Sequence, residues 1–207
     1  MRKLHLIIIF MLCLAGQCMA QNYTQAQVRQ RIASAAAKTQ TLTCDFVQAK
    51  SVKMLKRSIV SRGKMWYAKP SKLRWEYVQP YKYVFLLNGN TVTLKNSGGS
   101  TKMGVAQNKM FQEIARIMMG SVLGSCVKDS RDFSVRLSGR GNDWQAMLTP
   151  KRNPMKQMFK TVVVHFDMAK ALVSKIVMTE KGGDMTVITL KNVRLNSNIH
   201  AQTFSLR

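Results

Sequence analysis

The chain has 207 residues, 46% of them hydrophobic, and its 33 Lys and Arg against 9 Asp and Glu give a formal net charge of +24. This length is typical of one domain with a real apolar core, and neither a repeat nor a linker divides it. Such an excess of positive charge favours polyanions or anionic membrane surfaces as partners, without deciding between them.

The first twenty residues have the order of a secretory leader. A basic pair at positions 2 and 3 precedes an apolar run over 4–14, and small and polar residues follow up to Ala20. This order is typical of a secretory signal peptide. We therefore expect residues 1–20 to be removed and residues 21–207 to form a single soluble, secreted domain.

Cys18 raises the alternative of a lipid anchor. A lipobox needs a small residue directly before the cysteine, and Gln17 stands there. Cleavage after Ala20 is therefore the favoured interpretation. No later apolar run approaches the roughly 20 residues that a membrane-spanning helix needs.

A helix is predicted directly after the leader. Thr24 is placed as an N-cap with Gln27 closing a capping box, and Tyr23 and Val28 are spaced as a hydrophobic staple. The apolar residues then recur on one face up to about Lys38, so this helix should lie against an apolar surface.

From Leu42 onward the hydrophobic period changes to two, which predicts strands. Leu42, Cys44 and Phe46 share one face, and further strand signals occur over 51–55 and 59–67. The connections are short, so the sheet should be antiparallel.

Residues 63–80 concentrate the large side chains and predict a hairpin. Its turn is Lys69-Pro70-Ser71-Lys72, where the fixed φ of proline suits the second position. In the second strand, alternation should place Leu73, Trp75 and Tyr77 on one face and Arg74 and Glu76 on the other. The first face is either ordinary core or a binding surface.

Another hairpin is predicted over 83–94, because Asn88-Gly89 between two apolar runs is a strong turn signal. Residues 96–100 predict a flexible loop. Apolar residues from Met110 to Met118 then recur at helical spacing, which fits either a core helix or a lid over the sheet. The remaining segments, 133–148, 158–166, 172–180 and 185–195, predict more strands, about ten in all, and a sheet of that length must curl or close.

The sequence carries no recognisable catalytic or metal-binding motif. His165 and His200 lie on separate segments without metal-ligand spacing, and the carboxylates are dispersed. We expect no enzyme, no cofactor and no metal. Cys44 and Cys126 are the cysteines left after the leader, and a disulfide between them is possible, although Cys44 is equally plausible as a small buried strand residue.

Four motifs carry a resemblance to a known family: Asp45-Phe46-Val47-Gln48, then Gly63-x-Met65-Trp66, then Lys69-Pro70-x-x-Leu73-Arg74-Trp75-Glu76-Tyr77-x-x-Pro80, then Asn88-Gly89. Together they resemble the periplasmic outer-membrane lipoprotein carrier family, LolA. The similarity is strongest from Leu42 to Leu94. The C-terminal half matches mainly by its element order.

The resemblance implies a mainly β fold with α: an incomplete, half-open antiparallel barrel of about ten or eleven strands with helices over its concave face. It implies a periplasmic carrier, expected as a monomer, that binds lipoprotein acyl chains and moves them from an inner-membrane lipoprotein-releasing ABC transporter to an outer-membrane acceptor. The basic surface would add transient contact with anionic membranes, and no nucleic acid is expected.

The same resemblance assigns site residues in this sequence. The lid helix would present Phe111, Ile114 and Met118, and Lys69 would lie at the rim used for transfer, where studied family members have arginine. Lysine lacks the planar fork of arginine, which puts the standard acceptor contact in question. The acyl-chain cavity would be lined by apolar strand residues: Phe46, Met65, Tyr67, Leu73, Trp75, Tyr77, Phe85 and Leu87.

Two other functions fit the sequence. A half-barrel of this kind could sense glycolipids or lipoproteins without transporting them, and copurified lipoproteins that pass to membranes would favour transport. A basic surface protein that binds polyanions would instead show steep salt dependence and indifference to lipids.

Overall fold

The computed structural model describes residues 23–104, 119–120, 123–127, 132–153 and 155–206. One antiparallel sheet of eleven strands dominates this part of the chain. The strands are β1 (Thr41–Val52), β2 (Arg57–Ala68), β3 (Lys72–Gln79), β4 (Tyr83–Asn88), β5 (Thr91–Asn96), β6 (Gly99–Gly104), β7 (Phe133–Arg140), β8 (Asp143–Pro150), β9 (Phe159–Asp167), β10 (Leu172–Glu180) and β11 (Met185–Leu195).

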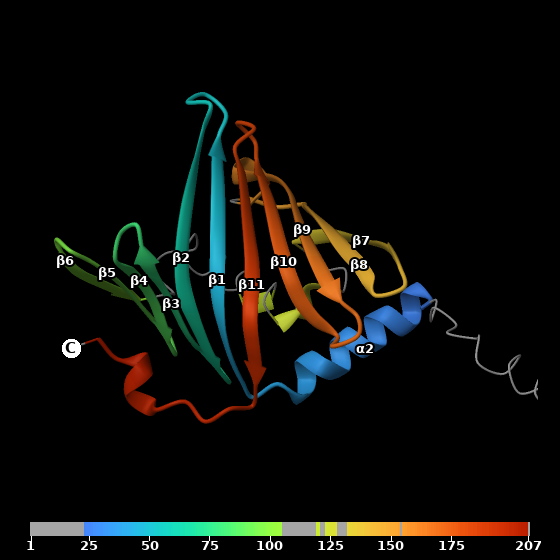
Figure 1. The fold of residues 1–207 in the computed structure, drawn as a ribbon, viewed down its shortest axis with the longest axis horizontal. Coiled ribbons are helices and arrows are strands. Elements are labelled where there is room, and N and C mark those ends of the chain that lie inside the picture. Colours follow the sequence, from blue (N-terminus) through green and yellow to red (C-terminus); the bar gives the residue numbers. More distant parts are fainter. Residues whose placement is uncertain (1–22, 105–118, 121–122, 128–131, 154, 207) are drawn as a thin grey trace, which may run out of the picture.

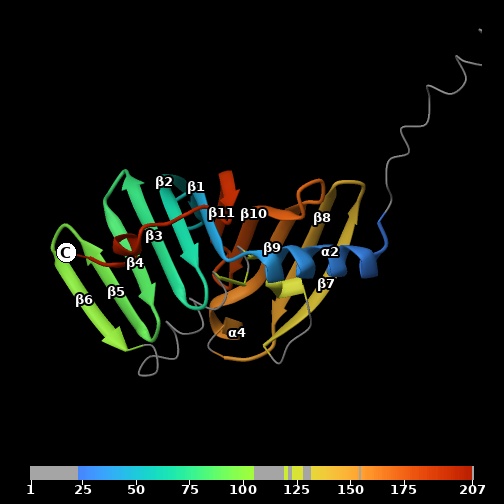
Figure 2. The ribbon, with the colours of Figure 1, turned by 90° about the horizontal axis from the view of Figure 1, so that it is seen from below.

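The sheet is a meander that joins the two ends of the chain at its centre. Its order is β6-β5-β4-β3-β2-β1-β11-β10-β9-β8-β7, so β1 pairs with β11 while β6 and β7 form the two edges. The strands curve around a concave face without closing (Figures 1 and 2). The predicted half-open antiparallel barrel of ten or eleven strands is therefore confirmed.

Helix α2 (Gln25–Lys38) lies across one end of the half-barrel (Figure 2). The predicted capping box is present, since the Thr24 side chain accepts from the Gln27 backbone and the Gln27 side chain accepts from the Thr24 backbone. Val28 and Ile32 are buried. Arg29 donates to the carbonyl of Val127, which belongs to the same apolar cluster as Val28 and Ile32, so the helix is tied to the concave face.

Three short helical segments complete the described structure: η2 (Ser125–Val127), α4 (Met155–Met158) and η3 (Ala201–Phe204). No helix within the described ranges is long and apolar enough to cross a membrane.

Two apolar clusters hold the sheet. The larger lies on the concave face and includes residues from α2, η2 and strands on both sides of the β1–β11 seam. The smaller lies on the convex face, where Phe204 of η3 packs against Val84 and Leu86 of β4. The chain after β11 therefore returns across the outside of β3 and β4.

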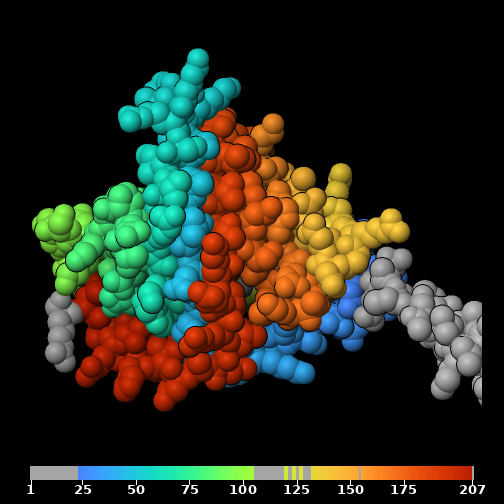
Figure 3. Space-filling view, viewed as in Figure 1, coloured from blue at the N-terminus to red at the C-terminus, as the bar shows by residue number. Residues whose placement is uncertain are grey.

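The hairpin of β1 and β2 extends beyond the neighbouring strands and projects from the sheet, as the space-filling view shows (Figure 3). Its turn, Lys53 to Lys56, lies beside the turn between β10 and β11, because Ser51 pairs with Met185.

Two local predictions were wrong. Residues 51–55 do not form a strand of their own: β1 continues to Val52 and a turn follows. The predicted flexible loop over 96–100 is a two-residue turn at 97–98, because Asn96 ends β5 and Gly99–Gly104 form the edge strand β6. The predicted leader over 1–20 and the predicted lid helix over 110–118 lie outside the described residues.

Candidate functional site

The register of β1 to β5 aligns apolar side chains in three rows across the concave face. Alternation along each strand places every second residue on this face, and antiparallel pairing places those residues side by side. The rows are Phe46–Gly63–Tyr77–Tyr83, Cys44–Met65–Trp75–Phe85–Leu94 and Leu42–Tyr67–Leu73–Leu87–Val92.

All eight residues assigned to the acyl-chain cavity lie in these rows and belong to one apolar cluster. Tyr77 is partly buried, and the other seven are buried: Phe46, Met65, Tyr67, Leu73, Trp75, Phe85 and Leu87. The structure thus brings them together on a single face.

Phe46 is the centre of an aromatic group on this face. Its ring lies 4.4 Å from that of Trp75 and 5.1 Å, edge-on, from that of Tyr77. Gly63 makes this packing possible, since a Cβ there would collide with the Phe46 ring and with the carbonyl oxygen of Glu76. The glycine of the sequence motif is thus explained by close approach of a ring to the backbone.

Few polar groups enter the aromatic group. The Tyr77 hydroxyl donates to Oε1 of Gln48 at 2.9 Å, and burial raises the pKa of Tyr77 to about 12, so the phenol is neutral. The indole N–H of Trp75 is buried, and no group of the described residues accepts a hydrogen bond from it. This part of the concave face is therefore uncharged and mostly hydrocarbon.

The apolar face continues on the other side of the β1–β11 seam. Further buried residues form a row across β11 to β7: Ile188, Ile176, Val164, Ala146 and Leu137. The sequence analysis missed these residues as site candidates. The sequence does show alternation here, in Phe133/Val135/Leu137 and Trp144/Ala146/Leu148, and this alternation predicted strands. It did not indicate that the strands on the two sides of the β1–β11 seam share one concave face.

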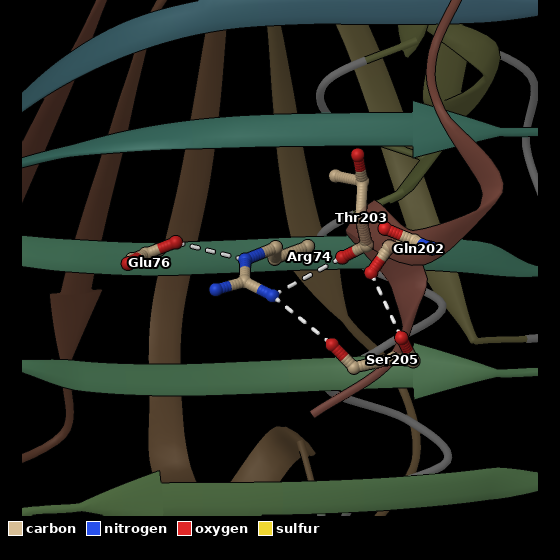
Figure 4. A network of polar contacts seen from close by, with 5 residues as sticks. All are labelled: Arg74, Glu76, Gln202, Thr203 and Ser205. Carbon is tan, nitrogen blue, oxygen red and sulfur yellow. Dashed lines mark hydrogen bonds and ion pairs between the residues drawn. The ribbon is translucent and has the colours of Figure 1, made fainter. Parts of the chain in front are cut away.

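Arg74 and Glu76 lie on the opposite, convex face, as alternation predicts, and the Arg74 head group is held in hydrogen bonds there instead of extending into solvent. Its Nε donates to Glu76 at 2.8 Å, and its Nη1 donates to the carbonyl oxygens of Thr203 at 3.1 Å and Ser205 at 3.4 Å (Figure 4). The side chain is only 17% exposed. Arg74 therefore fastens the C-terminal segment to β3.

Lys69 lies in the turn between β2 and β3, next to the end of α2. Its Nζ donates to the carbonyl of Ala37 at 2.7 Å, and its backbone N–H donates to the carbonyl of Gln40 at 2.9 Å. A helix C-terminus leaves carbonyls without partners, and a lysine is a suitable donor for one of them. A single ammonium thus makes one carbonyl contact where an arginine fork would make several.

The possible disulfide is not formed, because Cys44 and Cys126 are both free thiols. Cys44 is buried in the row with Met65 and Trp75, and Cys126 packs against the same cluster. Burial raises the pKa of each thiol to about 12. Each is therefore a small apolar residue of the core.

Phe111, Ile114 and Met118, the residues assigned to the lid, lie outside the described residues. Met119 and Gly120, which follow them directly, are helical, and Met119 packs against the concave cluster. Among the described residues no group of three His, Cys, Asp or Glu could hold a metal ion. The chemical property that the concave face provides is the exclusion of water from hydrocarbon.

The open antiparallel half-barrel with its apolar concave face is the carrier-like fold of a family of lipid- or lipoprotein-binding proteins. The family model of the outer membrane lipoprotein carrier protein LolA matches residues 37–207, and the chain belongs to this family. A comparison with curated proteins gave no match.

Solved structures share the fold at low sequence identity. An uncharacterized conserved protein from Thermus thermophilus is 10% identical with a TM-score of 0.55, covering 89% of this chain and 95% of that one. The complex structure of Pseudomonas aeruginosa MucA/MucB shows 13% sequence identity and a TM-score of 0.50. The match covers 88% of this chain and 61% of that chain. A LolA superfamily protein from Nitrosomonas europaea shows 9% sequence identity and a TM-score of 0.47. The match covers 89% of this chain and 98% of that chain.

Proposed function

We propose that this protein is a periplasmic carrier that binds the acyl chains of lipoproteins on its concave face and shuttles them from the inner to the outer membrane. The observation that carries the proposal is the set of continuous apolar rows over β1 to β5, backed by membership of the carrier family.

The energy of the task explains why such a face is needed. Burying one 16-carbon acyl chain is worth about 0.8 kcal/mol per CH₂, roughly 12 kcal/mol in all, so a lipoprotein does not leave its bilayer unaided. A carrier must supply a dry apolar surface in place of the membrane. The uncharged aromatic group around Phe46 and Trp75 is such a surface.

Release requires that the face be adaptable. Met65 lies among the aromatic residues, and methionine adjusts to ligands of different shape. A movable helix over 110–118 would open and close the cavity. With no hydrolysis by the carrier itself, cargo would pass from the ABC transporter to the outer-membrane acceptor because each step is favoured by differential affinity.

The other parts of the proposal rest on charge and on the leader. Residues 1–20 would direct secretion and be removed, and the large net positive charge would favour brief contact with anionic membrane surfaces. The carrier would act as a monomer. Lys69 would lie at the rim used for transfer, beside the C-terminal end of α2.

A pair of substitutions on β3 tests the concave site. Trp75→Glu should abolish binding of a triacylated peptide, because a carboxylate buried without a partner costs several kcal/mol in desolvation. The matched control is Val78→Glu on the same strand. Val78 is 43% exposed and alternation places it on the convex face, so acyl binding should be kept.

Far-UV circular dichroism establishes that both variants are folded. Arg74→Glu is unsuitable as the control, because Arg74 holds the C-terminal segment. If folded Trp75→Glu binds the peptide as well as the wild type does, the concave face is not the acyl site. A second measurement, the transfer of bound lipopeptide to acceptor vesicles, then distinguishes a carrier from a sensor that binds without transport.

A further inference from the structure

The projecting hairpin of β1 and β2 ends in exposed apolar side chains. Met54 is 88% exposed and Leu55 is 56% exposed in its turn. Ile59 and Val60 follow at 45% and 46%. Neighbouring strand residues face opposite sides, so the exposure of both shows that this hairpin stands clear of other layers on its two faces.

Basic residues surround this apolar end. Lys53, Lys56 and Arg57 flank Met54 and Leu55 in the sequence, and all three are exposed. Over 50–60 and 180–185 there are five basic residues against two acidic ones. Both acidic side chains are already engaged, Glu180 with Lys50 at 3.1 Å and Asp184 with the backbone N–H of Lys53 at 3.0 Å.

The same contacts fix the hairpin on its neighbour. Besides the Asp184 bond, Ser51 and Ser58 share a hydrogen bond of 3.0 Å across the hairpin, and the Lys53 side chain lies over Gly183. Met185 of β11 adds a further exposed apolar side chain beside the base. The exposed methionine and leucine are thus presented on a hairpin held by hydrogen bonds.

We propose that the β1–β2 tip, residues 53–60, is a membrane-docking device that inserts Met54 and Leu55 into the interface of bilayers containing anionic phospholipid. Apolar side chains at a projecting point, ringed by cations, match a surface that is hydrocarbon at depth and negative at the headgroups. A protein partner would need a groove shaped to this point, whereas a fluid bilayer accepts it without one.

This docking deepens the membrane contact of the proposed function and does not depend on acyl binding. It would also fix how the molecule is oriented on the membrane. Lys69 and the end of α2 lie at the other end of β1 and β2, since Thr41 pairs with Ala68 and Val52 pairs with Arg57. Docking by the tip would leave the Lys69 end free for a protein partner.

The test uses the protein from Gln21 onward, free of lipid, with vesicles of phosphatidylcholine alone or mixed with phosphatidylglycerol. Cosedimentation should show binding to the mixed vesicles. The double variant Met54→Ser and Leu55→Ser should lose about tenfold in partitioning for each side chain that is fully transferred. Met147→Ser, which alters an exposed methionine on β8, is the control and should change nothing.

The contribution of the basic residues around the tip is tested in the same assay. Lys56→Gln with Arg57→Gln should weaken binding about fivefold for each charge and reduce its salt dependence. Arg140→Gln with Lys170→Gln removes the same charge from the other end of the sheet, at the end of β7 and in the β9–β10 turn, and should leave binding within about twofold.

Insertion is read directly from a Met54→Cys variant carrying an environment-sensitive fluorophore, because the two native thiols are shielded. Its emission should shift to the blue on mixed vesicles, and that of labelled Met147→Cys should not. Absence of vesicle binding, or equal losses for both charge pairs with no effect of the serine variants, would overturn the proposal. Lipopeptide binding, measured separately, should be unchanged in every tip variant.

Discussion

At the scale of single residues, Gly63 decides whether the aromatic group can form. Its missing side chain leaves the space that the Phe46 ring occupies against β2, and the carbonyl of Glu76 closes the same space from β3. One atom at this position would therefore disturb both the ladder and the concave face.

Gly63→Ala should lower the free energy of unfolding by about 2 to 3 kcal/mol, because the added methyl must displace a buried ring or a paired strand. Urea denaturation followed by far-UV circular dichroism measures this. The control is Gly182→Ala in the β10–β11 turn, where a Cβ meets nothing within 4 Å, and stability should change by less than about 0.5 kcal/mol. Equal stability of the two variants would show that Phe46 does not lie across Gly63.

The two thiols give a second prediction at this scale. Cys44 and Cys126 should both be counted as free, with and without reductant, and should react slowly with a thiol reagent near pH 8 until the protein is unfolded. Their pKa values, raised from 9.0 to about 12, mean that the folded state holds more protons than the unfolded state between these pH values. Stability should therefore fall as pH rises through that window. A count that rises from zero to two on reduction would establish a disulfide between them.

At the scale of elements, the C-terminal segment is held to the convex face by a few contacts of different kinds. Arg74 donates to two of its carbonyls, Asn88 donates to the carbonyl of Phe204 at 3.1 Å, and the Phe204 ring is buried against β4. The segment covers one face of β3 and β4 while the other face lines the candidate site. Its detachment would therefore expose Leu86 and Val84 without opening the concave cluster.

Phe204→Ala and Arg74→Ala should each release this segment. The first removes a buried ring, at a cost of about 3 kcal/mol, and the second leaves carbonyls without a donor. Hydrogen exchange should accelerate over 199–206 and in β4, with the concave strands β8 and β9 unaffected. Gln202→Ala is the control, since that side chain is exposed and exchange should stay as in the wild type. If all three variants show the same exchange over 199–206, Arg74 and Phe204 do not hold this segment to the sheet.

The elements also show where sequence reasoning succeeds and where it stops. The capping box at Thr24, the Asn88-Gly89 turn and the alternation from Leu73 to Tyr77 are local signals, and each predicted its element. Strand β6 has the sequence Gly-Ser-Thr-Lys-Met-Gly with no alternation of apolar residues, so it resembled a loop. It is a strand because β5 offers an unpaired edge and Met103 packs beside Val92.

The contacts of Arg74 were beyond local reasoning for a different reason. Alternation placed its side chain on the convex face correctly. Nothing in the sequence around it indicates that a segment more than a hundred residues later crosses that face. The same applies to the far half of the concave surface, where Val164 and Ala146 join the site only through the long meander.

At the scale of the whole molecule, one sheet provides three separate surfaces. The concave face is apolar and uncharged, the convex face carries Arg74 and the C-terminal segment, and the β1–β2 tip carries exposed apolar and basic residues. The seam between β1 and β11 lies near the middle, so pairing of the first and last strands joins the two halves of the concave face. The proposed cargo, membrane and partner contacts would therefore be made at different places on the molecule.

Covalent mapping shows directly whether acyl chains lie on the concave face. A lipopeptide with a photoactivatable diazirine near the end of one acyl chain is bound and irradiated, and the labelled residues are identified by mass spectrometry. We expect labels on concave residues such as Phe46, Met65 and Trp75, lost when unlabelled lipopeptide competes. Competable labelling confined to the β1–β2 tip or to the convex face, with the concave strands unlabelled, would contradict acyl binding at this face.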